Sequence, residues 1–376
     1  MAVHHPNRPK HAHGDGRLAE LDLLRFIAAL AVLAFHYLVA YASVWGDRPA
    51  ELFPAVAPVA GLGILGVELF FMISGFVILM SAWGRGLGAF ARSRVVRLYP
   101  AYWLSLIAVA ALYGLTSATA LNPKLSPEHY LVNASMFQRL FKITDAAGVY
   151  WSLWAELRFY LLIAILVLVG VTYGRVLVFG GVWLAAALGA ELLGDPVLNE
   201  IVMPRYAPYF VAGMALYLIH KHGSAWLPWI YFVAGWAMSL HSALERVHGR
   251  IKVAGFKNMP VTDLSVIITI TLIFAVMALV ALGLLRVRSR GWLTALGATT
   301  YPLYLFHSTI AVALIPLLVG DLPPWVVATV TTLAAVLLSY AVYFFAERPI
   351  QRLMKPRRTP QSTSTPAVQD EKASVP

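Results

Sequence analysis

The sequence contains no cysteine and few charged residues. Lysine, arginine, aspartate and glutamate make up only 12% of the 376 residues, whereas about 25% is usual in soluble globular domains. The absence of cysteine excludes disulfide bonds, thiolate catalysis and metal sites built on cysteine. The scarcity of charge excludes a soluble fold of this length, because such a fold would lack the polar residues that cover its surface.

Hydrophobic residues take the place of the missing charges. They make up 60% of the chain, and the mean hydropathy is +0.72, so the chain has too much apolar surface to remain disordered. A helix needs roughly 20 apolar residues to cross the hydrocarbon core of a bilayer. Runs of about this length predict an all-α polytopic integral membrane protein with about ten transmembrane helices. They are residues 21–43, 59–81, 99–115, 150–170, 176–193, 206–221, 225–243, 263–285, 299–319 and 325–346.

The positive charges predict the orientation in the membrane. If the N-terminus is cytoplasmic, the dense arginine clusters at 92–97 and 286–290 both fall on the cytoplasmic side, as the positive-inside rule requires. Ten spans then place both termini in the cytoplasm, and we expect a multi-pass protein of the plasma (inner) membrane. No basic stripe interleaves with exposed aromatic residues, so we expect no nucleic-acid partner.

The two ends of the chain differ in composition from the middle. Residues 1–17 are rich in His, Pro and Gly, and residues 356–376 in Pro, Ser, Thr and Gln, which predicts two disordered tails. Residues 18–355 are predicted to form one transmembrane domain. We interpret the histidines of the N-terminal tail as part of an unstructured polar leader rather than as metal ligands, and we expect no metal site.

Ionisable residues inside a span are costly and usually face the interior of the bundle or a wet cavity. Arg25 and His36 lie eleven positions apart in the first span, which places both on one face of a helix. Asp22 shares that face and can pair with Arg25. The face therefore carries a basic group near the cytoplasmic entrance and an imidazole deep in the membrane.

Glu68 lies in the second span at a depth comparable with that of His36. A carboxylate beside an imidazole fixes its tautomer and raises its basicity, so we interpret His36 and Glu68 as a functional pair. Gly66 and Gly75 flank this carboxylate and permit close approach of neighbouring helices.

Three further groups of polar residues have both a functional and a structural interpretation. Ser152 and Glu156 lie one turn apart on one face of the fourth span, in its outer half. Arg94 and Arg97 precede the third span, where they could bind phosphates or anchor to anionic lipid headgroups. The ninth span contains Tyr304 and His307, and His307 could be a ligand or a hydrogen-bonded packing residue.

These motifs together resemble the membrane-bound acyltransferase family 3, a group of bacterial integral-membrane O-acyltransferases. Arg25 and His36 have the spacing of the family's first-span Arg and His, and Gly66–Phe76 is similar to its G-V-[DE]-x-F-F-x-x-S-G-[FY] motif. Arg94–Pro100 resembles its R-x-x-R-L-x-P loop, and Trp151–Glu156 its W-S-L-x-x-E segment. Tyr301–His307 and Glu347–Pro349 also match, so six blocks in order span residues 20 to about 355.

The resemblance implies an O-acyltransferase that moves an acyl group, usually acetyl, from cytoplasmic acyl-CoA to a hydroxyl of a carbohydrate or glycoconjugate. It implies acyl-CoA as cosubstrate, with no tightly bound cofactor. His36 would be the general base or acyl carrier, Glu68 would orient it, and Glu156 would act on the acceptor together with Ser152. The remaining expected substrate-binding residues are Arg25, Arg94, Arg97, His307 and Tyr304.

Two other functions are kept as alternatives. An enzyme of this kind could instead tailor a secondary metabolite such as a macrolide antibiotic, since the Ala-, Val- and Arg-rich composition suits a high-GC bacterium. The intramembrane His and Glu residues could also form the proton relay of a secondary transporter. Transporters of this size usually contain internal repeats with paired broken helices, and the sequence contains no such repeat.

Overall fold

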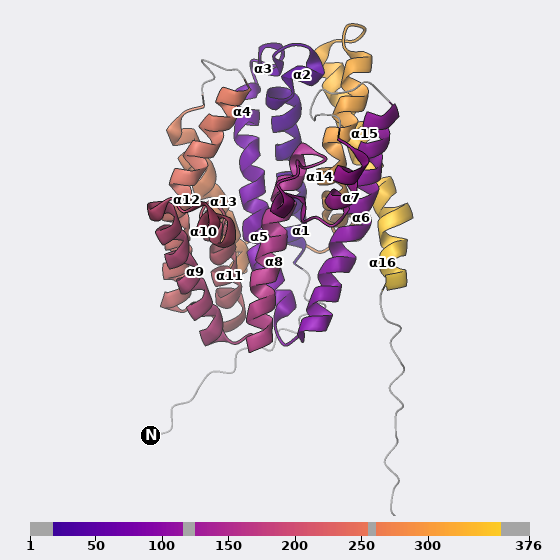
Figure 1. Cartoon of the computed structure of the whole chain (residues 1–376). Helices are drawn as coiled ribbons and strands as arrows, with labels where there is room; N and C mark the ends of the chain where they lie inside the picture. Colours follow the sequence, from indigo (N-terminus) through magenta and orange to yellow (C-terminus); the bar gives the residue numbers. More distant parts are fainter. Residues whose placement is uncertain (1–17, 116–124, 255–260, 355–376) are drawn as a thin grey trace, which may run out of the picture.

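The computed structural model describes residues 18–115, 125–254 and 261–354, and this part of the chain is built from helices without a β-strand. The predicted tails 1–17 and 356–376 lie outside the described residues. The helices that run along the long axis of the bundle form most of the molecule (Figure 1). They are α1 (Ala19–Phe35), α5 (Gly66–Ala82), α6 (Leu87–Leu115), α8 (Trp151–Val169), α9 (Tyr173–Leu193), α11 (Ala207–His222), α12 (Trp226–Val253), α13 (Asp263–Ala281), α14 (Gly291–Leu318) and α15 (Pro324–Val342).

Shorter helices connect these elements or extend them. Two are π-helical turns, η1 (His36–Ala40) at the end of α1 and η5 (Tyr343–Glu347) at the end of α15. The others are α2 (Ala42–Trp45), α3 (Pro49–Leu52), α4 (Ala57–Leu62), η2 (Gly63–Leu65), α7 (Pro127–Ala134), η3 (Gln138–Phe141), η4 (Gly148–Tyr150), α10 (Pro196–Val202) and α16 (Arg348–Met354).

Eight helical segments of the described residues are long and apolar enough to cross a membrane, which confirms the prediction of an all-α polytopic membrane protein. Each of the ten predicted runs overlaps a helix, but α11 and α12 are not among the eight. α11 has only 16 residues and is buried along most of its length. α12 continues ten residues beyond the predicted run, to Val253, and this added part contains Glu245, Arg246 and Arg250.

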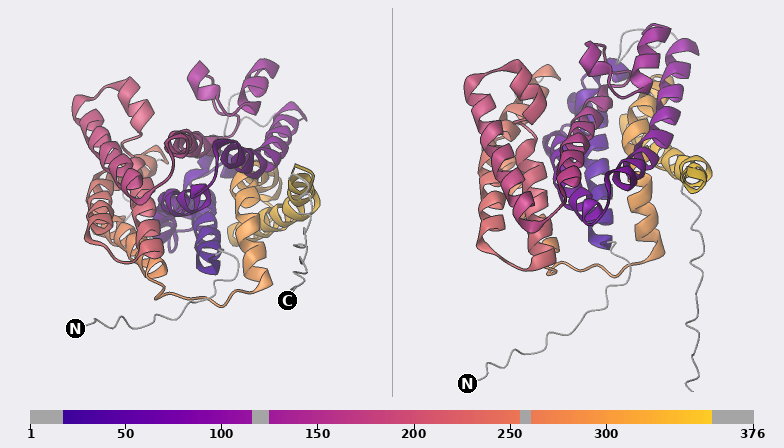
Figure 2. Two further views of the ribbon diagram at one scale, coloured as in Figure 1. Left: turned by 90° about the horizontal axis from the view of Figure 1, so that it is seen from below. Right: turned by 60° about the horizontal axis from the view of Figure 1, so that its bottom comes forward.

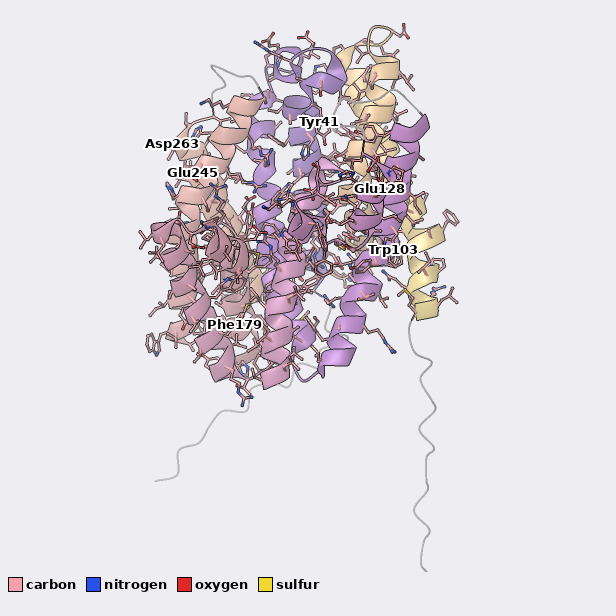
Figure 3. The ribbon with its side chains drawn as sticks, viewed as in Figure 1. Tyr41, Trp103, Glu128, Phe179, Glu245 and Asp263 are labelled. Atoms are coloured by element: carbon pink, nitrogen blue, oxygen red, sulfur yellow. The ribbon has the colours of Figure 1, made fainter. Side chains whose placement is uncertain are left out.

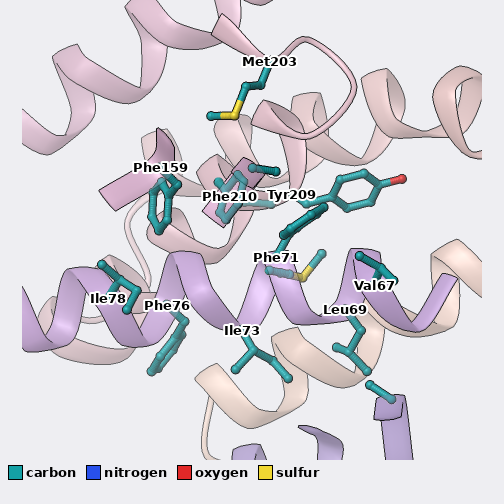
Figure 4. Packing of buried hydrophobic residues seen from close by; sticks show 14 of the residues in the cluster. Val67, Leu69, Phe71, Ile73, Phe76, Ile78, Phe159, Met203, Tyr209 and Phe210 are labelled. Carbon is teal, nitrogen blue, oxygen red and sulfur yellow. The ribbon is translucent and has the colours of Figure 1, made fainter. Parts of the chain in front are cut away.

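α5 is the central helix of the bundle. α1 and α5 lie between a group formed by α9–α13 and a group formed by α6 and α14–α16 (Figure 2). Ala57–Ala82 is the most buried of the eight candidate spans, because α5 packs against α1, α8 and α11. Figure 4 shows Phe71 of α5 against Phe210 of α11, whose ring stacks on that of Phe159, while Phe76 points to the opposite side of α5.

Glycines allow the central helices to approach closely, as the sequence predicted. A Cβ atom at Gly75 would overlap the carbonyl oxygen of Phe210 in α11, and one at Gly213 would overlap the carbonyl oxygen of Met72. A Cβ atom at Gly66 would likewise overlap the carbonyl oxygen of Ala28 in α1. Backbones in contact at these points bring the polar residues of α1 and α5 to fixed positions, because no intervening side chain can yield.

The two basic clusters lie at the same end of the bundle. The arginines at 92–97 belong to the first turns of α6, and those at 286–290 form the connection from α13 to α14 (Figures 1 and 2). The first and last described residues, Leu18 and Met354, line the same cavity as the first cluster. We call the end of the bundle that carries both arginine clusters the basic end.

Candidate active site

A cavity of about 890 Å³ extends inward from the basic end between α1, α5, α6, α8 and α14. Its volume lies in the range of roughly 300–1,000 Å³ that is usual for small-molecule sites. Six of the nine residues predicted for the site line it. They are Arg25, Arg94, Arg97, Ser152, Glu156 and Tyr304. We call it the large cavity.

The two arginines predicted to bind phosphate have different partners. The Arg97 guanidinium forms an ion pair with the fully buried carboxylate of Glu347 at 3.1 Å and lies over the ring of Tyr301. Arg94 donates to Ser93 and lies over aromatic rings, and no carboxylate of the described residues pairs with it. Arg94 is therefore the guanidinium of this pair whose charge is left for a ligand.

Arg25 lines the large cavity from α1. Its guanidinium is 3.9 Å from the carboxylate of Asp22, which confirms the predicted pairing within α1. Asp22 is held close to α14 at Gly297, where a Cβ atom would overlap the carboxylate. The residue at 297 therefore has to be a glycine if Asp22 is to stay beside Arg25.

Ser152, Glu156 and Tyr304 line the inner part of the large cavity. The Ser152 and Tyr304 hydroxyls are hydrogen-bonded at 2.6 Å. Glu156 accepts hydrogen bonds from Ser74 and from Tyr160. The sequence placed Ser152 and Glu156 in an outer half, away from the arginines, but the structure brings them into one cavity with Arg25, Arg94 and Arg97.

His36 and His307 form a hydrogen-bonded pair. Nε2 of His307 lies 3.1 Å from Nδ1 of His36, and Nδ1 of His307 lies 2.8 Å from the carbonyl oxygen of Tyr304. A carbonyl oxygen can only accept a hydrogen bond, so Nδ1 of His307 carries a proton and, in the neutral ring, its Nε2 is an acceptor. His36 donates from Nδ1 to this acceptor and to the carbonyl of Val32, 2.9 Å away.

These hydrogen bonds assign one tautomer to the pair. With its proton on Nδ1, a neutral His36 has a lone pair on Nε2, which is the arrangement of a general base. His307 is buried, whereas His36 retains partial exposure. Neither ring lines the large cavity. Tyr304 links the histidine pair to this cavity, because its ring lies against His307 at 5.9 Å and its hydroxyl is hydrogen-bonded to Ser152.

The predicted pairing of Glu68 with His36 is wrong. The carboxylate of Glu68 pairs with the guanidinium of Arg246 in α12, with Oε1 and Nε 3.0 Å apart, and His307 takes the place expected for Glu68. The reason is the rotation of α5, which turns Glu68 toward α12 while its neighbour Val67 faces the large cavity. Sequence position sets the depth of a residue in a span but not the direction of its side chain.

Glu347 and Arg246 are the site residues that the sequence interpretation missed. Glu347 closes the last apolar run, and a carboxylate in that position already calls for a buried cation. Arg246 and Arg250 are one helical turn apart just after the seventh predicted run. The signal that would have found them is the continuation of helical periodicity beyond residue 243.

Comparison with known proteins identifies the family. The family model described as an acyltransferase domain matches residues 18–344. The chain belongs to this acyltransferase family. It is therefore a membrane acyltransferase, and the match spans every site residue described above except Glu347.

Relatives of this acyltransferase include proteins from two bacterial genera. It is 28% identical to the exopolysaccharide production protein ExoZ of Rhizobium meliloti over 79% of this chain and 92% of the relative. It is 23% identical to nodulation protein 10 of Rhizobium leguminosarum bv. viciae over 92% of this chain and 96% of the relative. Identity to acyltransferase MdmB of Streptomyces mycarofaciens is 32%, over 39% and 38% of the two chains. No solved structure is significantly similar to the chain.

Proposed function

We propose that this acyltransferase moves an acetyl-sized acyl group from cytoplasmic acyl-CoA to a hydroxyl of a carbohydrate or glycoconjugate. The observation that carries the proposal is the large cavity, which has three arginines at its mouth and the hydroxyl pair of Ser152 and Tyr304 at its inner end. The ring of Tyr304 lies against His307, which is hydrogen-bonded to His36. The basic end then faces the cytoplasm, in agreement with the positive-inside rule.

The donor would lie along the large cavity. Guanidinium groups bind phosphates through paired, charge-assisted hydrogen bonds, so Arg94 and Arg25 would hold the phosphates of acyl-CoA. Arg97 would add its positive charge beside these phosphates while it remains paired with Glu347. Ser152, Glu156 and Tyr304 would contact the inner, acyl-bearing end of the donor, next to the two histidines.

His36 would remove the proton of the acceptor hydroxyl. Nε2 takes the proton, the hydroxyl oxygen forms a bond to the thioester carbonyl carbon, and the carbon–sulfur bond breaks. His36 then returns the proton to the departing sulfur, so the products are an ester and free CoA. Proton transfer by a positioned base typically accelerates a reaction by about 10²–10⁴-fold. His307 and the carbonyl of Val32 would keep Nε2 of His36 unprotonated by accepting the hydrogen bond from Nδ1.

The relatives favour a carbohydrate acceptor over a secondary metabolite. ExoZ, named for exopolysaccharide production, aligns over 79% of this chain, whereas acyltransferase MdmB aligns over 39%. Membership of an acyltransferase family also favours an enzyme over the alternative of a proton-coupled transporter.

The test uses membranes from a deletion strain, which contain the native acceptors, with the protein supplied from a plasmid. The wild-type protein should release free CoA from acetyl-CoA and restore an acetyl-sized mass on the surface glycans. His36→Ala should lower both by at least about 100-fold, while the exposed control His222→Ala should leave both unchanged.

Three results would change the assignment. Undiminished CoA release by His36→Ala would remove His36 from the chemistry. Labelled acetyl bound to His36 after acid quenching would make the residue an acyl carrier rather than a base. A mass lost from secreted metabolites instead of glycans would identify the secondary-metabolite alternative.

A further inference from the structure

A second cavity lies on the other side of α5. It has a volume of about 250 Å³ and is lined by Glu68, by Arg205 and Tyr206 before α11, and by Glu245, Arg246 and Arg250 of α12. Glu245 marks its edge on the side of the bundle that also carries Asp263 (Figure 3). Small-molecule sites usually measure roughly 300–1,000 Å³. Because this cavity is slightly smaller, it can hold one unit of a larger acceptor molecule.

Aromatic side chains separate the two cavities. Phe71 lines the large cavity and Tyr206 lines the second one, and their rings lie 5.1 Å apart. Trp151 completes this partition, with its ring 5.6 Å from Tyr206 and the Arg246 guanidinium 4.4 Å above it. The second cavity is therefore a site of its own and not an extension of the large one.

The polar groups of the second cavity are only partly satisfied by one another. Arg246 pairs with Glu68, and Arg205 pairs with Glu245 at 3.4 Å. Arg250 has no carboxylate partner among the described residues. Glu68 is 1% exposed, yet its Oε2 atom has no hydrogen-bond partner in the described part of the chain.

These two unsatisfied groups specify the chemistry of a ligand. A free guanidinium at the exposed edge binds an oxyanion such as a carboxylate or a phosphate. A buried carboxylate oxygen without a donor is costly unless a ligand supplies one, and a sugar hydroxyl is such a donor. A sugar that carries an acidic group supplies both an oxyanion for Arg250 and a hydroxyl donor for Glu68 from a single unit.

The second cavity lies next to the proposed base. α12 packs against η1, the π-helical turn that begins with His36, and against η2, which leads into α5. Arg246 and Arg250 both lie within electrostatic range of His36. A hydroxyl-bearing ligand in the second cavity would therefore approach His36 from the side opposite the donor.

We propose that the second cavity binds the acceptor and that this acceptor is a sugar with an oxyanion, held by Arg250 while Glu68 accepts a hydrogen bond from a hydroxyl. This inference rests on the proposed function and names its acceptor class. It departs from the sequence-based expectation that Glu156 and Ser152 bind the acceptor, because both line the donor cavity.

The test measures binding, so it does not depend on turnover. Methyl β-D-glucopyranoside, its 6-phosphate and methyl β-D-glucuronide differ only at carbon 6. Each is titrated against the purified full-length protein in phosphatidylcholine nanodiscs, with binding followed by saturation-transfer NMR. We expect at least one anionic probe to bind ten-fold or more tightly than the neutral one. The two anionic probes distinguish a phosphate from a carboxylate acceptor.

Arg250→Gln should abolish this preference and leave the affinity for acetyl-CoA unchanged. Lys252→Gln is the matched control, because Lys252 is an exposed cation two residues away that does not line the cavity. Glu68→Gln should weaken the binding of all three probes.

The inference is overturned if the three probes bind with equal affinity, which is the result expected if Arg250 binds only the phosphate of lipid headgroups. It is also overturned if the Arg250→Gln variant still prefers the anionic probes. Failure of the proposed function has a different signature, since acyl transfer to native acceptors would then be absent while the binding preference persisted.

Discussion

His36 and His307 differ in exposure although they form one hydrogen-bonded pair. The buried ring, His307, is anchored to the backbone carbonyls of Tyr304 and Leu303. The partly exposed ring, His36, is the one with an unused nitrogen. In such a pair the buried member orients and the accessible member reacts, so we regard His307 as a positioning residue rather than as a substrate ligand.

The distinction between the two histidines can be measured. His307→Ala removes one of the two acceptors of the Nδ1 proton of His36 and leaves only the carbonyl of Val32, so the tautomer with a free Nε2 is favoured less strongly. We expect kcat to fall about 100-fold, with the KM for acetyl-CoA unchanged because the arginines of the large cavity are untouched. His307→Gln offers an acceptor oxygen near the position of Nε2 and should recover part of kcat. A rise in KM with constant kcat would instead indicate a substrate ligand.

At the scale of elements, the Arg97–Glu347 ion pair joins the start of α6 to η5 at the end of α15. Glu347 also accepts a hydrogen bond from Gln351, which ties α16 to the same point at 2.7 Å. This pair holds the last helices against the mouth of the large cavity. Arg97 therefore has a structural role that Arg94, three residues earlier in α6 and lining the same cavity, does not share.

The two arginines should respond differently to substitution. Arg97→Ala leaves the buried carboxylate of Glu347 without its cation, which typically costs about 3–5 kcal/mol, so the thermal unfolding temperature should fall. Arg97→Ala combined with Glu347→Gln should regain part of that loss. Arg94→Ala should leave the unfolding temperature unchanged and raise the KM for acetyl-CoA at least ten-fold. Equal thermal effects of Arg94→Ala and Arg97→Ala would contradict this division of roles.

At the scale of the whole molecule, the basic clusters lie at one end of the bundle, and the connections between α1 and α5 and between α14 and α15 lie at the other (Figure 1). The large cavity begins at the basic end. The acyl group would have to travel only to the middle of the molecule, where the two cavities approach each other across Phe71 and Tyr206.

The orientation can be tested directly because the chain has no cysteine. Single cysteines at Gly86, at the basic end, and at Asp321, in the connection from α14 to α15, would be the only reactive thiols. In intact spheroplasts we expect a membrane-impermeant maleimide to label Asp321→Cys and not Gly86→Cys. Both should react after permeabilisation. The reverse pattern in intact spheroplasts would place the basic end outside and remove cytoplasmic acyl-CoA as the donor.

The amino-acid sequence alone determined the class of protein, and it predicted site residues most of which the structure brings together. Scarce charge and long apolar runs require a membrane bundle, and six of the nine predicted site residues share one cavity. It did not predict which residues of different helices pair. His36 with His307, Arg97 with Glu347 and Glu68 with Arg246 are contacts between residues more than 170 positions apart. Such pairs depend on how each helix is rotated about its axis. The packing of helices in the tertiary structure sets that rotation, and for α5 the close contacts at Gly66, Gly75 and Gly213 are part of it.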